Sequence, residues 1–394
     1  MSIVKQLLTP LSSGQAGTYY HGLSRKEVTP AYLFDTHGKD GTLCPIISWN
    51  PIWQHRIAGE LAAQLNETSH TIARDQLETY RRHYMRMWST LPLKSNKSFS
   101  YFVGACALDA LTNTYTKRNL DKLLKITLKL VQDGAFVEGS HYSIYCSTAF
   151  DRVESLLDKF YTHDSMWVDV KHNMRALNKW QSLISNSAGV VASLGDSWYE
   201  KTKPCDEGSD GVYDYKDMTI RRQGKWVVVE NHRKTNFALH EHCHANEVLV
   251  AYDDEWIIQG SGMPSYKQVM AKPWRWRRPR NHFFTESKLD WFSIWRLRKG
   301  ESITRSVEIT NDAVVIKDIG AKIARFPVAS DYKYSDTGNA VFYNYKGFSF
   351  VTRGKIKSVK EDHAWQSGSY NEENKVKVLR IKGTDMETTI KNPQ

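Results

Sequence analysis

The apolar residues of this chain change their spacing near its middle. Between residues 50 and 200 they recur every three or four positions, which is the period of amphipathic helices. Six segments show this pattern, and their apolar positions begin at Ile57, Leu77, Phe99, Leu120, Val153 and Met174. The first segment follows Asn50 and Pro51, a cap and first-turn pair, and the fourth ends at Gly134. This half of the chain is therefore predicted to be helical.

Beyond residue 200, short β-rich runs replace the helical pattern. They are KWVVVE, NEVLVAY, EWIIQ, SITRSVEIT, AVVIKDI, AVFYNY, FSFVTR and KVKVLRI. The pairs Asp253-Asp254 and Lys346-Gly347 each separate two runs, which predicts tight hairpins. Many short strands with few helices indicate an antiparallel sandwich.

The two patterns predict an α+β chain with two domains. The polar stretch 194–211 contains Gly and Asp and is the candidate linker. We expect a helical domain over residues 1–200 and an antiparallel β-sandwich domain over residues 201–394.

Charge narrows the classes of partner. Lys and Arg number 54 against 43 Asp and Glu, giving a net charge of +11 over 394 residues. Such a balance favours nucleic acid, a membrane surface or an acidic polysaccharide, without choosing among them. The basic aromatic run WRWRRPR (274–280) lies in a predicted loop.

The cysteines and the lengths of the apolar runs indicate in which cellular compartment the protein is expected. Five cysteines without a CxxC pair favour free thiols and a reducing compartment. The sequence has no clear signal peptide and no apolar stretch of membrane-span length. We expect a cytoplasmic location, although a removed signal or another export route is compatible with the sequence.

The segment HEHCHANE (240–247) concentrates histidine. Alternate residues of a strand face the same side, so His240, His242 and His244 could converge on one point. Three interpretations are open: a metal site, a catalytic site, or exposed histidines at a domain edge.

A second segment, DGAFVEGSHYSIYCSTAF (133–150), places Tyr142 and Tyr145 at the start of a predicted helix, three residues apart on one face. Taken alone, two such tyrosines fit ordinary packing equally well.

Together these segments resemble a known family. EGSHYSIY resembles the EGxxYxxY stretch of the heparinase II/III-like polysaccharide lyases, and HCHANEVLVAYDDEWIIQGSGMPSY resembles their HxHAD/N segment. SNKSFSYFVGACALDAL (95–111) is similar to their Asn-His helix, with Asn96 at the asparagine and Lys97 where histidine is usual. RNHFFTESK (280–288) falls where the family carries an HNT-type strand. The family order is kept from about residue 50 to 300.

The resemblance implies a fold and a reaction. The fold is a helical (α/α) toroid followed by an antiparallel β-sandwich, although this helical half is short and leaves room for an incomplete toroid. The reaction is β-elimination at a uronic acid, which leaves a C4–C5 double bond. Asn96 would neutralise the substrate carboxylate, Tyr142 or Tyr145 would act as acid and could also act as base, and His242 would be the opposing base.

Further residues are implied as contacts to the substrate. Lys97 could place a positive charge against a carboxylate or point away, and Glu138 would orient the loop or a basic partner. His244 would support the site. Arg275 and Arg277 could pair with an acidic polysaccharide, or their loop could pack at the domain interface.

The family resemblance also raises the possibility of a structural zinc ion. Some family members hold a structural zinc with the second His of HxHA, an Asp near the hairpin turn and a later His. His244 and His282 are the candidate ligands here, but Gln259 and Gly260 stand where the Asp is expected. The missing carboxylate argues against zinc, and no other cofactor is expected.

Two alternatives to a lyase are open. A non-catalytic or biosynthesis-associated relative that binds an acidic glycan is favoured by Lys97 and the missing carboxylate. It is opposed by the presence of Asn96, both tyrosines and His242. A nucleic-acid-binding protein is supported only by the charge and by WRWRRPR, because no recognisable nucleic-acid module is present.

Overall fold

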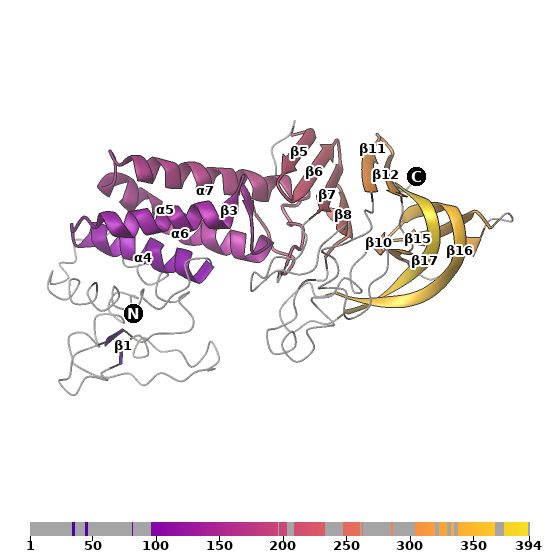
Figure 1. Cartoon of the computed structure of the whole chain (residues 1–394), viewed down its shortest axis with the longest axis horizontal. Helices are drawn as coiled ribbons and strands as arrows, with labels where there is room; N and C mark the ends of the chain where they lie inside the picture. Colours follow the sequence, from indigo (N-terminus) through magenta and orange to yellow (C-terminus); the bar gives the residue numbers. More distant parts are fainter. Residues whose placement is uncertain are drawn as a thin grey trace. The chain divides into compact units, whose positions relative to one another are not determined.

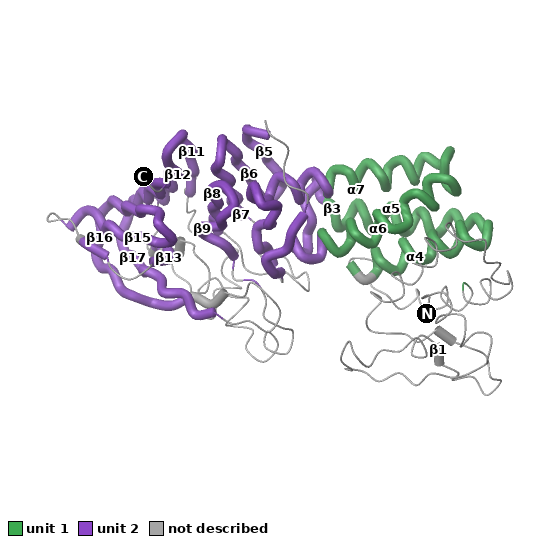
Figure 2. The backbone as a smooth tube through the Cα atoms, turned by 180° about the vertical axis from the view of Figure 1, so that it is seen from behind, with its two compact units in different colours: residues 1–131, 144–177 green, residues 132–143, 178–394 purple. Residues whose placement is uncertain are grey.

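The computed structural model describes most of the chain from residue 96 onward (Figure 1). The described ranges are 96–195, 197–202, 209–232, 247–260, 262, 304–319, 323–328, 332–334, 338–366 and 374–392, with Arg81 and the strand pairs 34–35, 44–45 and 285–286. The chain divides into two compact units, which Figure 2 colours separately. One comprises residues 1–131 and 144–177, and the other residues 132–143 and 178–394.

Helices occupy the first part of the described chain. They are α4 (Asn96–Leu111), α5 (Lys117–Leu130), α6 (Ser140–Phe160) and α7 (Ser165–Leu183). The predicted helices near Phe99, Leu120 and Met174 are confirmed, and the segment from Val153 is the second half of α6. The segments from Ile57 and Leu77 lie outside the described residues apart from Arg81, so a closed toroid stays a prediction.

The end of α5 differs from the sequence prediction. The helix stops at Leu130, and the chain forms a short hairpin of β3 (Val131–Gln132) and β4 (Ala135–Phe136). Its turn residues Asp133 and Gly134 both have positive φ, 52° and 96°. Asp-Gly is the pair that a two-residue hairpin turn favours, because both positions need left-handed backbone. Gly134 therefore serves a hairpin turn and does not cap a helix.

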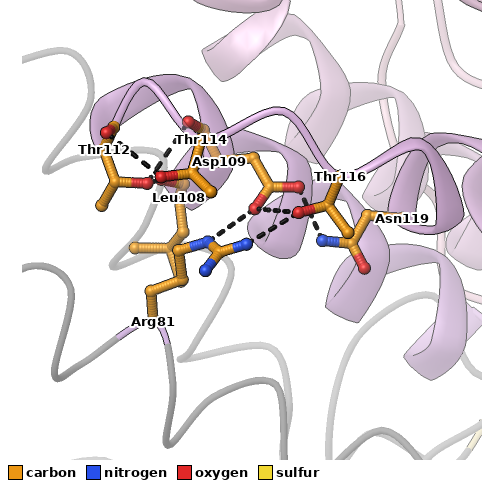
Figure 3. Close-up of polar contacts among 7 residues, drawn as sticks. All are labelled: Arg81, Leu108, Asp109, Thr112, Thr114, Thr116 and Asn119. Carbon is orange, nitrogen blue, oxygen red and sulfur yellow. Dashed lines mark hydrogen bonds and ion pairs between the residues drawn. The ribbon is translucent and has the colours of Figure 1, made fainter.

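A buried polar cluster joins α4 to α5 (Figure 3). Asp109 near the end of α4 is fully buried and accepts hydrogen bonds from Arg81 Nε at 2.7 Å and Asn119 Nδ2 at 2.7 Å. Thr116 Oγ1 donates to Asp109 at 3.2 Å and accepts from an Arg81 guanidinium nitrogen at 2.7 Å. Because a buried carboxylate needs such donors, these contacts fix the α4–α5 connection.

A five-stranded antiparallel sheet follows the helices. Its strands run in sequence order: β5 (Gly211–Tyr215), β6 (Met218–Gln223), β7 (Trp226–Asn231), β8 (Glu247–Tyr252) and β9 (Glu255–Ile258). Asp253, with φ 56°, turns the chain where Tyr252 pairs with Glu255, which confirms the first predicted hairpin.

The C-terminal part forms an eight-stranded sheet, again antiparallel. It contains β10 (Thr285–Glu286), β11 (Thr304–Ile309), β12 (Ala313–Ile319), β13 (Ile323–Pro327), β14 (Tyr332–Tyr334), β15 (Ala340–Tyr345), β16 (Phe348–Gln366) and β17 (Asn374–Lys391). The second predicted hairpin is also confirmed, with Lys346 and Gly347 at φ 50° and 80°. A separate pair joins β1 (Phe34–Asp35) to β2 (Cys44–Pro45).

The two larger sheets share one hydrophobic core. Trp226, Val250 and Ile258 of the first sheet belong to the same buried cluster as Phe350 and Ile381 of the second. Alternating inward residues from two antiparallel sheets make a sandwich-like arrangement, as the strand pattern predicted. The domain boundary at residue 200 remains a prediction.

Two cysteines of the helical part, Cys106 and Cys146, carry free, buried thiols.

Among the described helices, none has the length and apolar character needed to cross a membrane.

Candidate functional site

The EGSHYSIY segment begins α6, and its first residues are docked on a distant stretch of chain. Gly139 has φ +93°, and a Cβ at this position would overlap the carbonyl oxygen of Leu194. Ser140 N–H donates to that same oxygen at 3.0 Å, and Leu194 N–H donates to Ser140 Oγ at 3.1 Å. The glycine of the motif is therefore required by close backbone approach.

The turn after β9 docks on the same stretch. A Cβ on Gly260 would overlap the carbonyl oxygen of Ser193. Ser193 N–H donates to Gln259 Oε1 at 2.7 Å, and Gln259 Nε2 donates to the carbonyl oxygen of Val191 at 3.2 Å. Residues 191–195, here called the docking segment, thus receive both the start of α6 and the end of β9.

These contacts bear on the zinc expectation. Gln259 stands where the family resemblance places a metal-binding Asp, and its amide bonds the backbone of the docking segment. Within the described ranges, no three His, Cys, Asp or Glu side chains are grouped as a metal site would require. His244 and His282 lie outside those ranges, so a zinc there stays untested.

Tyr145 lies in a short hydrogen-bonded chain with α4. Ser100 Oγ is 3.1 Å from the Tyr145 phenolic oxygen and 2.9 Å from the carbonyl oxygen of Asn96. The single Ser100 proton can serve only one of these acceptors at a time. Burial raises the pKa of Tyr145 well above its ordinary value, although Ser100 and Arg152 act to lower it. The phenol is therefore protonated and uncharged at neutral pH.

The other predicted residues of this region are buried. Asn96, the first residue of α4, is 2% exposed, and Tyr142 is 7% exposed. Glu138, immediately before α6, is 1% exposed. A carboxylate at that depth has to be compensated by donors or cations, so Glu138 suits an orienting role better than contact with bulk solvent.

The structure also reveals a pair that the sequence did not indicate. His141 Nδ1 contacts Glu200 Oε1, and both side chains are 22% exposed. The imidazole lies edge-on to Trp198, with ring centroids 4.4 Å apart, and to Tyr142, at 4.8 Å. A carboxylate on one ring nitrogen fixes the tautomer and orientation of a histidine. His141 occupies a variable position of the EGxxYxxY pattern and Glu200 lies 59 residues away, so no local signal joins them.

The remaining predicted residues lie outside the described residues. They are His240, His242, His244, Arg275, Arg277 and His282, and the same holds for the side chain of Lys97 within α4. Their roles stay predictions.

Comparison with known proteins identifies the fold. No protein-family model and no curated protein sequence matches the chain. Among solved structures, the heparan sulfate lyase HepC from Pedobacter heparinus is similar, with 12% identity, a TM-score of 0.59, and 87% of this chain matched to 68% of that one. A heparinase III is similar at 11% identity and a TM-score of 0.61, covering 88% of this chain and 68% of the other. The chain therefore has a polysaccharide lyase fold, and identities this low establish the fold alone.

Proposed function

We propose that this protein is a polysaccharide lyase of the heparinase II/III-like group that cleaves a uronate-containing acidic glycan by β-elimination. The observation that carries the proposal is the fold, which resembles heparan sulfate lyases over 87% of the chain. The EGSHYSIY segment at the start of α6 supports the proposal, because the glycine and the serine of this family-like motif both contact the backbone of Leu194. We further propose that the helical part forms a toroid.

The chemistry begins at C5 of the uronic acid. Removing the C5 proton beside a carboxylate would build a second negative charge, so the site must donate hydrogen bonds to that carboxylate. Asn96 is assigned this role, since an amide donates hydrogen bonds without acting as a base. Its place as the first, buried residue of α4 restricts its side chain.

Tyr145 is assigned as the acid. Its phenol gives a proton to the departing O4, the C4–O bond breaks, and the electron pair left by the C5 proton forms the C4–C5 double bond. Ser100 Oγ, 3.1 Å from the phenolic oxygen, can then donate to the phenolate that remains. The raised pKa of Tyr145 keeps the proton available at neutral pH.

His242 is assigned as the base that takes the C5 proton, because a neutral imidazole accepts protons near pH 7. This assignment rests on the HxHAN resemblance. Tyr142 is the alternative acid, and comparison with Tyr145 is part of the test. Lys97, Glu138, His244, Arg275 and Arg277 are proposed to bind or orient the substrate. No water molecule is consumed in the elimination.

Ultraviolet absorbance of the new C4–C5 double bond tests the function. The protein is incubated with heparan-type glycans, hyaluronan, alginate and bacterial capsular polysaccharides. We expect the absorbance to rise with at least one of them and to be lost in the isosteric variant Tyr145→Phe. A Tyr145→Phe variant that retains full activity while Tyr142→Phe is inactive would move the acid to Tyr142. No absorbance on any glycan that the protein binds would contradict the lyase proposal.

A further inference from the structure

The long hairpin of β16 and β17 carries exposed basic residues on one face. These two strands are the long curved ribbons near the C-terminus in Figure 1. Lys360 pairs directly with Arg380, and Ser358 pairs with Lys382. All three basic side chains are exposed. We call Lys360, Arg380 and Lys382 the basic ladder.

Strand alternation places the ladder on the outer face of the sheet. Ile381 lies between Arg380 and Lys382, is fully buried and belongs to the sandwich core. Because successive side chains point to opposite faces, its two neighbours point away from that core. Lys360 shares their face, since directly paired residues of an antiparallel ladder lie on the same side.

The ladder is electrostatically unfavourable by itself. Directly opposed residues have Cβ atoms about 5 Å apart, and like charges in that position are destabilising. Arg380 and Lys382 are about 7 Å apart along their strand. Among the described residues, no ion pair joins the ladder to an acidic side chain, whereas nearby Lys377 is paired with Glu361 at 2.8 Å.

One acidic side chain close to the ladder offsets part of its positive charge. Asp362 lies two residues beyond Lys360 on the same strand face, and its Oδ1 accepts the backbone N–H of His363 at 2.8 Å. Further along β16, Lys355 is also exposed, and it pairs with Thr384, two residues beyond Lys382 on the partner strand. An anionic ligand with several charges would relieve the repulsion at once.

We propose that the basic ladder is a glycan-binding surface formed by residues other than the proposed catalytic ones, and that it holds an acidic polysaccharide chain. The ligand class rests on the proposed function. Single-stranded nucleic acid is the competing polyanion, but its binding surfaces combine basic grooves with aromatic stacking. The two residue pairs that form the ladder are Lys360–Arg380 and Ser358–Lys382, and neither pair contains an aromatic residue.

A pair of triple variants with equal charge change tests the proposal. The ladder variant is Lys360→Gln, Arg380→Gln and Lys382→Gln. The matched control is Lys117→Gln, Lys201→Gln and Lys216→Gln, which removes three exposed positive charges elsewhere. Each variant lowers the net charge from +11 by three, to +8. Affinity is measured with a labelled, size-fractionated heparin oligosaccharide and with a single-stranded oligothymidylate of equal charge, over a range of salt concentrations.

We expect the ladder variant to bind the heparin oligosaccharide about tenfold more weakly, with the slope of log affinity against log salt reduced by about two to three. The control should lose much less. The charge-conserving variant Lys360→Arg, Lys382→Arg should bind as the wild type does, which separates charge from folding. Equal losses in the two triple variants would overturn the inference, and so would a loss confined to oligothymidylate.

The same samples separate this inference from the lyase proposal. Double-bond absorbance is recorded during the binding measurement. Ladder-dependent binding without any absorbance would support the glycan surface while contradicting cleavage of that glycan. Absorbance that rises normally, with unchanged binding by the ladder variant, would support the lyase and overturn the glycan surface.

Discussion

Ser100 Oγ lies 3.1 Å from the phenolic oxygen of Tyr145, so one hydroxyl of α4 is directed at the candidate acid of α6. The contact links the segment that begins at Asn96 with the segment that carries the paired tyrosines. In the proposed elimination, this serine stabilises the phenolate that forms as the proton leaves.

Removing that serine should therefore slow catalysis without abolishing it. Ser100→Ala is expected to lower kcat by about tenfold to a hundredfold, because a hydrogen bond to a charged oxygen contributes about 1.5–3 kcal/mol. Tyr145→Phe should lower kcat by about 10²–10⁴, since it removes the acid itself. Initial rates of double-bond formation measure both effects, with circular dichroism as the control for folding. A Ser100→Ala variant slower than Tyr145→Phe would contradict this order.

The pH dependence should show that Tyr145 works in its neutral form. Burial raises the pKa of this phenol, so the proton is lost only at a pH above the ordinary tyrosine value of about 10. Activity that depends on this proton should not decline through Tyr145 ionisation below that pH. The measurement is kcat against pH in the wild type. If Tyr145 acted instead as a phenolate base, kcat would rise steadily across the alkaline range.

The His141–Glu200 pair is expected to position the first turn of α6. Glu200→Gln keeps the size of the side chain but removes the charge that orients the imidazole. We expect a lower kcat with little change in KM and in thermal stability. The Glu200→Asp variant should recover part of the activity. A loss of stability with unchanged kcat would assign the pair a structural role only.

Two glycines should be intolerant of any side chain. Gly139→Ala and Gly260→Ala would each drive a Cβ into a backbone carbonyl oxygen of the docking segment, so we expect losses of about 3 kcal/mol or more in unfolding free energy. Gly224→Ala is the matched control for Gly139→Ala, because both positions have positive φ, +55° and +93°, but no atom lies within 4 Å of a Cβ added at Gly224. It should cost about 1–2 kcal/mol. Chemical denaturation measures all three variants, and equal losses for Gly139→Ala and Gly224→Ala would show that the positive φ, and not the contact with Leu194, determines the cost.

The buried cluster around Asp109 should dominate the stability of the helical part. Asp109→Ala would remove the buried carboxylate to which Arg81 and Asn119 donate, at an expected cost of about 3–5 kcal/mol. Asp121→Ala removes the surface ion pair with Lys125 on α5 and should cost less than about 1 kcal/mol. Urea denaturation distinguishes the two, and comparable costs would show that burial contributes little here.

Sequence patterns predicted what local periodicity and turn chemistry determine. The helical period located α4, α5 and α7, and the pairs Asp253-Asp254 and Lys346-Gly347 located their hairpins, because each depends on residues within a few positions. Gly134 was misassigned as a helix end, since Asp-Gly after a helical run signals either a cap or a hairpin turn.

The contacts around the candidate site could not be predicted in the same way. Ser140 meets Leu194 across 54 residues, and Gln259 meets Ser193 across 66. The partners 191–195 overlap the polar stretch 194–211 that predicted a linker, yet Val191, Ser193 and Leu194 are buried. Polarity suggests solvent exposure, but backbone hydrogen bonds and two glycine contacts hold this stretch in the interior. The EGxxYxxY and HxHAN resemblances marked Ser140 and Gln259, but no pattern marked their partners in the docking segment.

The docking segment also has a consequence for local motion. The start of α6 and the turn after β9 both form hydrogen bonds with the backbone of residues 191–195. If either one detaches, it breaks hydrogen bonds of the docking segment, to which the other is also bonded. The amides of Ser140, Ser193 and Leu194 should therefore exchange with deuterium as one cooperative unit. A substitution near Gly260 should therefore increase the rate of amide hydrogen exchange at Ser140, more than a hundred residues earlier in the chain.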